Sequence, residues 1–139
     1  VLTPHPGEMA RLIERESGWG EMKRGELARA FVARFPRCTL LLKGARTVIA
    51  SQDHPLSYNT TGHPGMAAGG MGDVLTGLCA ALAGQGMGPP EAACLGAWLS
   101  GRAAEIAVRD SAQSPESLSA GDVASCLGAA FMDLRALVF

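Results

Sequence analysis

Three glycines stand ahead of an aspartate in residues 67–75, which read Ala-Ala-Gly-Gly-Met-Gly-Asp-Val-Leu. Glycines let a backbone approach a ligand closely and leave N–H groups facing a concavity that can hold an anion. A helix beginning at Asp73 would add the partial positive charge of its N-terminus. The segment therefore predicts an anion site with one carboxylate at its rim, suited to transferring a phosphoryl group to a hydroxyl. The alternative is a flexible loop in which Asp73 only caps the helix, since aspartate is a preferred N-cap residue.

Two better-known phosphate-binding loops do not match this segment. A Walker loop ends in Gly-Lys-Ser or Gly-Lys-Thr, whereas Gly72 is followed by Asp73. A dinucleotide-binding fingerprint that starts at Gly70 would need its third glycine where Leu75 stands. The predicted anion site is therefore of another kind.

A second candidate is residues 3–8, Thr-Pro-His-Pro-Gly-Glu, between a predicted strand end and a predicted helix. Ligand-contacting groups of α/β proteins often lie at such places. His5 could hydrogen-bond a hydroxyl or a phosphate while Glu8 caps the helix. The hexapeptide alone equally fits a turn that the prolines shape and His5 only fills.

Two further segments have residue types that suit a nucleotide. Lys43 ends a predicted strand and precedes a glycine, so it could place a positive charge near a phosphate, or it could be a solvated turn residue. Residues 59–65, Asn-Thr-Thr-Gly-His-Pro-Gly, offer short donors and acceptors beside glycines, although as a loop signal this is weak. His63 and His54 have no partner at metal-ligand spacing, and we expect both to be surface residues.

Composition limits the possible classes of protein. The chain of 139 residues suits one domain, and its net charge of −1 indicates neither nucleic acid nor a membrane surface as a partner. No segment is apolar for long enough to span a bilayer, and no signal peptide is visible. The cysteines have neither metal-ligand nor redox spacing and are expected to be buried thiols of a reducing compartment; they are Cys38, Cys79, Cys94 and Cys126. We therefore predict a cytoplasmic protein.

Hydrophobic periodicity predicts an α/β chain. Helices are expected near residues 8–16, 22–35, 73–84, 89–109 and 120–137, and the helix at 73–84 is apolar on nearly all sides, which favours burial. Two short strands at 39–42 and 47–50 enclose a hairpin-like turn, residues 1–3 are expected to end a strand, and residues 56–59 are extended. A polar loop is expected at 110–119.

Four segments in chain order, residues 3–8, 43–47, 59–62 and 64–77, closely resemble the ADP/ATP-dependent NAD(P)H-hydrate dehydratases. The string Pro-Gly-Met-Ala-x-Gly-Gly-Met-Gly-Asp-Val-Leu-Thr-Gly at residues 64–77 is the most specific part of the likeness. The resemblance implies a ribokinase-like three-layer α/β/α fold. It also implies repair of hydrated NADH or NADPH: the ring hydroxyl is phosphorylated from ADP (ATP in eukaryotic members), and the phosphate then leaves by elimination. Mg²⁺ is expected, because phosphoryl transfer from a nucleotide generally needs it.

The resemblance also implies roles for individual residues. Asp73 would be the base that activates the hydroxyl of the hydrate, and the amides of Gly70, Met71 and Gly72 would stabilise the transferring phosphoryl group. His5, together with Asp73, would contact the hydrated dinucleotide. The implied nucleotide-binding residues are Lys43, Gly44, Ala45, Arg46, Thr47, Asn59, Thr60, Thr61, Gly62 and Gly72. No protein ligand to a metal is implied.

Members of this family have a sizeable N-terminal half before the Thr-Pro-His-Pro-Gly-Glu segment, and only two residues precede it here. We therefore expect residues 1–139 to be one partial domain, the C-terminal portion of the fold, that requires the other half and forms a homo-oligomer.

Two other hypotheses for the function stay open. One is a small-molecule kinase of hydroxyethylthiazole kinase type, which would leave the phosphate on its product; the other is a non-catalytic nucleotide-binding fragment.

Overall fold

The computed structural model describes residues 1–16, 18–110 and 113–138. The chain divides into two compact units: unit 1 holds Val1–Asn59 and Met87–Cys94, and unit 2 holds Thr60–Gly86 and Leu95–Phe139. Among the described residues, no helix combines the length and the apolar character needed to cross a bilayer.

Unit 1 is built on a small sheet. Its strands β1 (Leu40–Leu42), β2 (Val48–Ala50) and β3 (Ser57–Tyr58) pair antiparallel in the order β1-β2-β3. Every residue of β1 and β2 is buried, as expected of short apolar runs. Leu2 forms a parallel bridge with Leu40 on the free side of β1. The predicted hairpin and the strand end at residues 1–3 are therefore confirmed.

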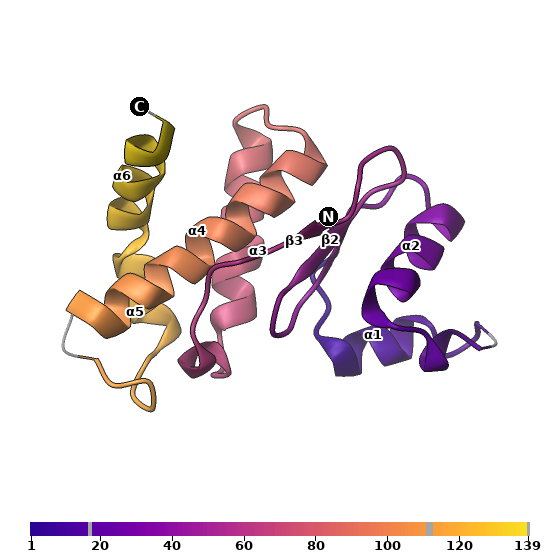
Figure 1. The fold of residues 1–139 in the computed structure, drawn as a ribbon, viewed down its shortest axis with the longest axis horizontal. Helices are drawn as coiled ribbons and strands as arrows, with labels where there is room; N and C mark the ends of the chain where they lie inside the picture. The colour runs from indigo at the N-terminus through magenta and orange to yellow at the C-terminus, as the bar shows by residue number, and fades with distance from the viewer. Residues whose placement is uncertain (17, 111–112, 139) are drawn as a thin grey trace. The chain divides into compact units, whose positions relative to one another are not determined.

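The helices of unit 1 are α1 (Pro6–Leu12) and α2 (Arg24–Arg34), with the 3-10 turn η1 (Trp19–Glu21) between them. Helix α2 packs on β1 and β2 through Leu27, Phe31 and Val32, and Figure 1 shows α1 and α2 near each other beside these strands. Helix α1 ends earlier than the predicted Glu16. The N–H of Glu16 bonds to the carbonyl of Ile13 at 2.9 Å, and this three-residue turn replaces the α-helical pattern.

In unit 2, helix α3 (Met71–Gly84) follows the 3-10 turn η2 (Pro64–Met66). Its buried residues follow one stripe, Met71, Leu75, Cys79 and Leu82, and most of the rest of its surface is exposed or half-buried. The expectation of burial on all sides is wrong for this chain. Much of the apolar composition of α3 is alanine and glycine, which expose little apolar surface and do not by themselves require burial.

Helix α4 (Pro89–Asp110) begins in unit 1 and ends in unit 2. A side chain at Gly96 would place its Cβ 2.6 Å from the sulfur of Cys79, so this glycine lets α4 pack closely on α3. Gly96 therefore sets how closely the two helices can approach.

The predicted helix at residues 120–137 is two helices, α5 (Ala120–Ser125) and α6 (Leu127–Val138). The break lies at Cys126, whose N–H is shared between the carbonyls of Asp122 and Val123. Val123 in α5 and Ala130 in α6 are both fully buried. The polar loop expected at 110–119 includes residues 111–112, which lie outside the described residues.

The four cysteines are free thiols, but only Cys79 is buried. Cys38, Cys94 and Cys126 are half-buried, so the expectation that all four are buried is wrong for three of them. Apolar neighbours in the sequence do not guarantee burial, because a residue's depth depends on which elements pack over it.

Candidate functional site

The glycine loop (residues 67–72) leads directly into α3. Gly70 is the N-cap of this helix and has a left-handed backbone with φ of 82°. That conformation is natural for glycine and strained for other residues. Asp73 is the third residue of the helix and is exposed, so the hypothesis that it is the N-cap is wrong.

The backbone at the start of α3 leaves donors unused. The N–H groups of Asp73 and Val74 bond to the carbonyl of Gly70 at 3.1 and 3.2 Å. Those of Gly70, Met71 and Gly72 make no hydrogen bond of good geometry with the described residues. Unpaired amides at a helix N-terminus attract an anion through hydrogen bonding and through the helix dipole. Asp73 is the only acidic residue of α3, and its carboxylate lies in this first turn.

Helix α1 begins with a different arrangement. The imidazole Nδ1 of His5 accepts hydrogen bonds from the N–H groups of Gly7 at 3.1 Å and Glu8 at 3.2 Å. The Glu8 carboxylate accepts in return from the N–H of His5 at 2.7 Å. The prediction that Glu8 caps this helix is confirmed, and His5 is part of the same capping box.

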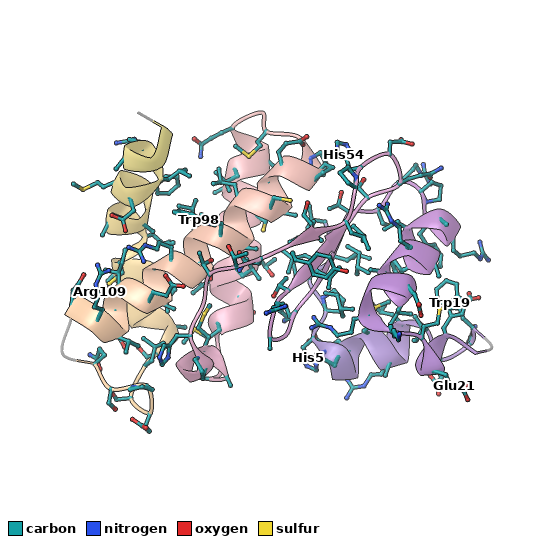
Figure 2. The ribbon with its side chains drawn as sticks, viewed as in Figure 1. His5, Trp19, Glu21, His54, Trp98 and Arg109 are labelled. Carbon is teal, nitrogen blue, oxygen red and sulfur yellow. The ribbon has the colours of Figure 1, made fainter. Side chains whose placement is uncertain are left out.

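The other edge of the His5 ring faces the Glu8 carboxylate and is partly exposed to solvent. Because Nδ1 accepts two hydrogen bonds, the proton of a neutral ring lies on Nε2. Nε2 is 3.4 Å from Oε1 of Glu8, and the side chain is 53% exposed. Figure 2 labels His5 at the start of α1. His5 can therefore cap the helix and still present a donor edge.

Glu8 connects His5 to the lysine turn (residues 43–47). The ammonium of Lys43 lies 3.6 Å from Oε2 of Glu8, and the Lys43 N–H donates to the carbonyl of Pro4 at 2.9 Å. The pKa of Glu8 is lowered, first by the hydrogen bond from the His5 backbone and then by the charge of Lys43. The structure thus places two predicted ligand-binding residues, His5 and Lys43, around one ionised carboxylate.

Arg24 on α2 holds the lysine turn by its carbonyl groups. Its Nη1 donates to Ala45 at 2.8 Å, and its Nη2 donates to Leu42 at 2.9 Å and to Lys43 at 3.1 Å. The turn needs such support, because Gly44 and Arg46 both have positive φ, 145° and 57°. Arg24 was not among the predicted site residues, because no local sequence pattern links a residue 18 to 21 positions away to this turn.

The remaining predicted nucleotide-binding residues form the threonine segment (residues 59–62). The N–H of Asn59 donates to the carbonyl of Thr47 at 2.9 Å, which joins Asn59 to the lysine turn in unit 1. Thr60, Thr61 and Gly62 belong to unit 2, as does the glycine loop. The imidazole of His63 accepts from the N–H of Gly65 at 3.2 Å and caps η2. His63 is half-buried, so the prediction that it is a surface residue is wrong. His54 is exposed, as expected.

The described residues contain no group of three histidine, cysteine or acidic side chains close enough to hold a metal ion.

Comparison with known proteins places these features in a family. The family model described as NAD(P)H-hydrate dehydratase matches residues 1–124. The chain is 52% identical over 123 residues to the bifunctional NAD(P)H-hydrate repair enzyme of Moorella thermoacetica, a match that covers 88% of this chain and 23% of that protein.

Two solved structures show the same fold. The ADP/ATP-dependent NAD(P)H-hydrate dehydratase of Bacillus subtilis, co-crystallised with ATP and Mg²⁺ and soaked with CoA, matches with a TM-score of 0.83 and 32% identity over 95% of this chain and 48% of that one. A ribokinase-like superfamily protein of Enterococcus faecalis matches with a TM-score of 0.69 and 27% identity over 94% of this chain and 43% of that one. The predicted ribokinase-like α/β fold is therefore confirmed. The chain spans about half the length of these structures, or less.

Proposed function

Because the chain belongs to the NAD(P)H-hydrate dehydratase family, we propose that it provides the second half of a domain that repairs hydrated NADH and NADPH. The reaction consumes ADP, with ATP as the alternative, and returns the intact dinucleotide. The Bacillus subtilis relative is named for this activity and for both nucleotides.

The chemistry has two steps. In the first, the ring hydroxyl of the hydrate attacks the terminal phosphorus of ADP; a P–O bond forms to the ring oxygen, the P–O bond to AMP breaks, and a base takes the hydroxyl proton. In the second, the ring C–O bond breaks, phosphate leaves with the bonding electrons, and loss of a proton from the neighbouring ring carbon restores the double bond. The products are NADH or NADPH, AMP and phosphate.

The observation that carries the proposal is the start of α3. Three backbone N–H groups there have no well-formed partner among the described residues, and the exposed Asp73 carboxylate follows them directly. Preorganised amides stabilise the charge of a transferring phosphoryl group, and a nearby carboxylate can take a hydroxyl proton. Asp73 is proposed as the base, and Gly70, Met71 and Gly72 as the donors.

The other predicted residues bind and orient in this proposal. His5 contacts the hydrated dinucleotide through the Nε2 edge that its capping role leaves available. The lysine turn and the threonine segment contact the nucleotide, and Lys43 supplies a positive charge. Gly72 lies near the nucleotide as well.

Mg²⁺ is expected to accompany the nucleotide and to offset phosphate charge. It usually binds to substrate phosphates, water and one or two carboxylates, so it needs no cage made by the protein. A cytoplasmic location is part of the same proposal and is supported by the four free cysteines.

The test uses the complete gene product with NADH hydrate and ADP. We expect recovered NADH together with equal amounts of AMP and free phosphate. Phosphate that stays bound to an organic product would instead favour a small-molecule kinase. Nucleotide binding with no turnover of any kind would favour a non-catalytic module.

A second experiment addresses the partial domain. We propose that residues 1–139 need the other half of the domain, in the same polypeptide or as a second chain, and that the complete protein forms a homo-oligomer. Supplying that half should convert a weakly stable, inactive chain into a cooperatively unfolding enzyme. Turnover by a monomer of residues 1–139 alone would contradict this part of the proposal.

A further inference from the structure

Helix α4 carries a carboxylate that holds the backbone of the threonine segment in unit 2. The N–H of Gly62 donates to Oε1 of Glu105 at 2.8 Å. The hydroxyl of Thr61 donates to the carbonyl of Trp98, about two turns earlier on the same helix, at 2.8 Å. Two consecutive residues of the segment are therefore fastened to α4.

Gly101 allows this close approach. A Cβ at Gly101 would lie 2.6 Å from the carbonyl carbon of Thr61 and 2.8 Å from the nitrogen of Gly62. Both atoms are backbone atoms and could not move aside as a flexible side chain could. The segment thus lies directly on the helix surface between Trp98 and Glu105, the first of which Figure 2 labels on α4.

The orientation of Glu105 is set by two further residues. Its second oxygen accepts from Nη1 of Arg102 at 2.9 Å. Arg102 also binds one oxygen of Asp133, on α6, through Nε at 2.7 Å and Nη2 at 2.6 Å. These contacts raise the pKa of Arg102, with the hydrogen bond to Glu105 as the largest cause. The chain of contacts runs from Gly62 through Glu105 and Arg102 to Asp133.

Glu105, Arg102 and Asp133 line an open hollow of about 400 Å³, and each of the three side chains is a quarter to two fifths exposed. Ion pairs that are partly solvated contribute little to stability. Gly62, in contrast, has a φ of 130° and lies in a stretch without regular secondary structure, so its conformation depends on what holds it. The Glu105 carboxylate therefore affects the backbone conformation of the threonine segment more than the stability of the fold.

We propose that Glu105 is a positioning residue: its carboxylate, oriented by Arg102 and Asp133, holds the Thr61–Gly62 backbone in the conformation that binds the adenine nucleotide. This rests on the proposed function, which assigns nucleotide binding to the threonine segment. Glu105 itself touches neither the nucleotide nor the reacting atoms in this proposal. Its loss should weaken nucleotide binding and spare the chemical step.

The test is a double-mutant cycle in the complete gene product, with ADP affinity measured by calorimetric titration. Glu105→Ala removes a charged acceptor and should weaken ADP binding by about tenfold or more, while kcat at saturating ADP stays within about threefold. Arg102→Ala should weaken binding less in the wild-type background and have no added effect in Glu105→Ala, because Arg102 acts through Glu105. The matched control is Asp110→Ala, which breaks the exposed pair with Arg109 at the end of the same helix and should change neither quantity.

Hydrogen exchange provides a readout that needs no ligand. Glu105→Ala should speed exchange of the Gly62 amide by about tenfold and leave the midpoint of thermal unfolding close to that of Asp110→Ala. If Glu105→Ala does not fold, Glu105→Gln replaces it in both experiments. The single amide oxygen of glutamine must then accept from both the Gly62 N–H and Arg102. The loss of ADP affinity and the faster exchange of the Gly62 amide should both appear, but at smaller size.

Several outcomes overturn the inference: unchanged ADP affinity in Glu105→Ala, a fall in kcat with affinity preserved, unchanged Gly62 exchange, or additive effects of the Arg102 and Glu105 variants. A wild-type protein that binds ADP but does not restore NADH would contradict the proposed function alone. In that case the affinity cycle still decides the role of Glu105. A wild-type protein that does not bind ADP would overturn both.

Discussion

Helices α1 and α3 begin in opposite ways, although both follow a predicted ligand-binding loop. At α1, the His5 ring accepts two backbone N–H groups and Glu8 returns a third hydrogen bond. At α3, the N-cap is Gly70, which has no side chain, and three successive N–H groups have no well-formed partner among the described residues. At the start of α1, side chains of the same segment bind the backbone N–H groups. At the start of α3, the backbone N–H groups remain available to a ligand.

The difference indicates separate tasks for the two starts. A helix N-terminus that its own side chains cap gains stability and loses its capacity for an outside anion. An uncapped N-terminus costs stability and keeps that capacity. We therefore expect substitutions at α3 to affect mainly ligand and chemistry, and substitutions at α1 to affect mainly folding.

The largest effect is expected for Asp73→Asn, tested in the complete gene product. Loss of a general base typically lowers the rate by about 10²–10⁴, so kcat should fall within that range. ADP affinity should stay within about threefold, because the backbone amides are unchanged. Steady-state kinetics and calorimetry measure the two quantities, with Asp53→Asn in an exposed turn as the control. Turnover above about a tenth of wild type would rule out Asp73 as the base.

In Gly72→Val, the branched side chain should block access of a ligand to the unpaired backbone N–H groups at the start of α3. Gly72 is not among the glycines with positive φ, so the substitution causes no backbone strain of the kind expected at Gly70. Valine is a better helix former than glycine, and the free energy of unfolding should be unchanged or slightly higher. ADP affinity should nevertheless fall by about tenfold or more, because the branched side chain occupies space near the amides.

Gly72→Ala is the matched control and should show an intermediate loss of affinity. If the valine variant binds ADP within about threefold of wild type, a phosphate does not approach this backbone closely. Calorimetric titration and urea denaturation of the three proteins separate binding from stability.

His5 variants separate capping from substrate contact. His5→Ala removes the cap acceptor and should lower the free energy of unfolding by about 1 kcal/mol. His5→Asn offers another good cap acceptor and should restore most of that loss. If His5 also contacts the dinucleotide, the asparagine variant regains stability but keeps a raised KM for the hydrate. Equal recovery of both quantities would mean that His5 only caps the helix.

The smallest effect is expected from titration of Glu8. Its pKa in the folded protein is lowered from 4.5, chiefly by the hydrogen bond from His5, so the ionised form stabilises the fold. That contribution is complete above pH 4.5, where the unfolded chain is also ionised, and is lost as pH falls through the lower folded value. Glu8→Gln should therefore differ from wild type in urea denaturation at neutral pH and converge with it in acid. A difference that persists unchanged in acid would contradict the role of the charge.

Local features were accessible from the sequence. Glu8 follows His5 at the three-residue spacing of a capping box, and the structure contains that box. Apolar runs around residues 43–46 predicted the antiparallel pair of β1 and β2. The grouped glycines ahead of Asp73 predicted a tight entry into a helix, although α3 starts at Met71, because Gly70 takes the left-handed conformation that ends the loop earlier.

The sequence by itself thus determined the short-range hydrogen bonds, the alternation of strands and helices, and the residue types able to handle a phosphate. Only the tertiary structure decided that Arg24 supports the lysine turn, that Glu105 holds the threonine segment, and that α3 is buried on a single stripe. The contact of Glu105 spans 43 positions along the chain. Such contacts depend on how whole elements pack, and a polar residue on a helix gives no local sign of the distant backbone group that it will meet.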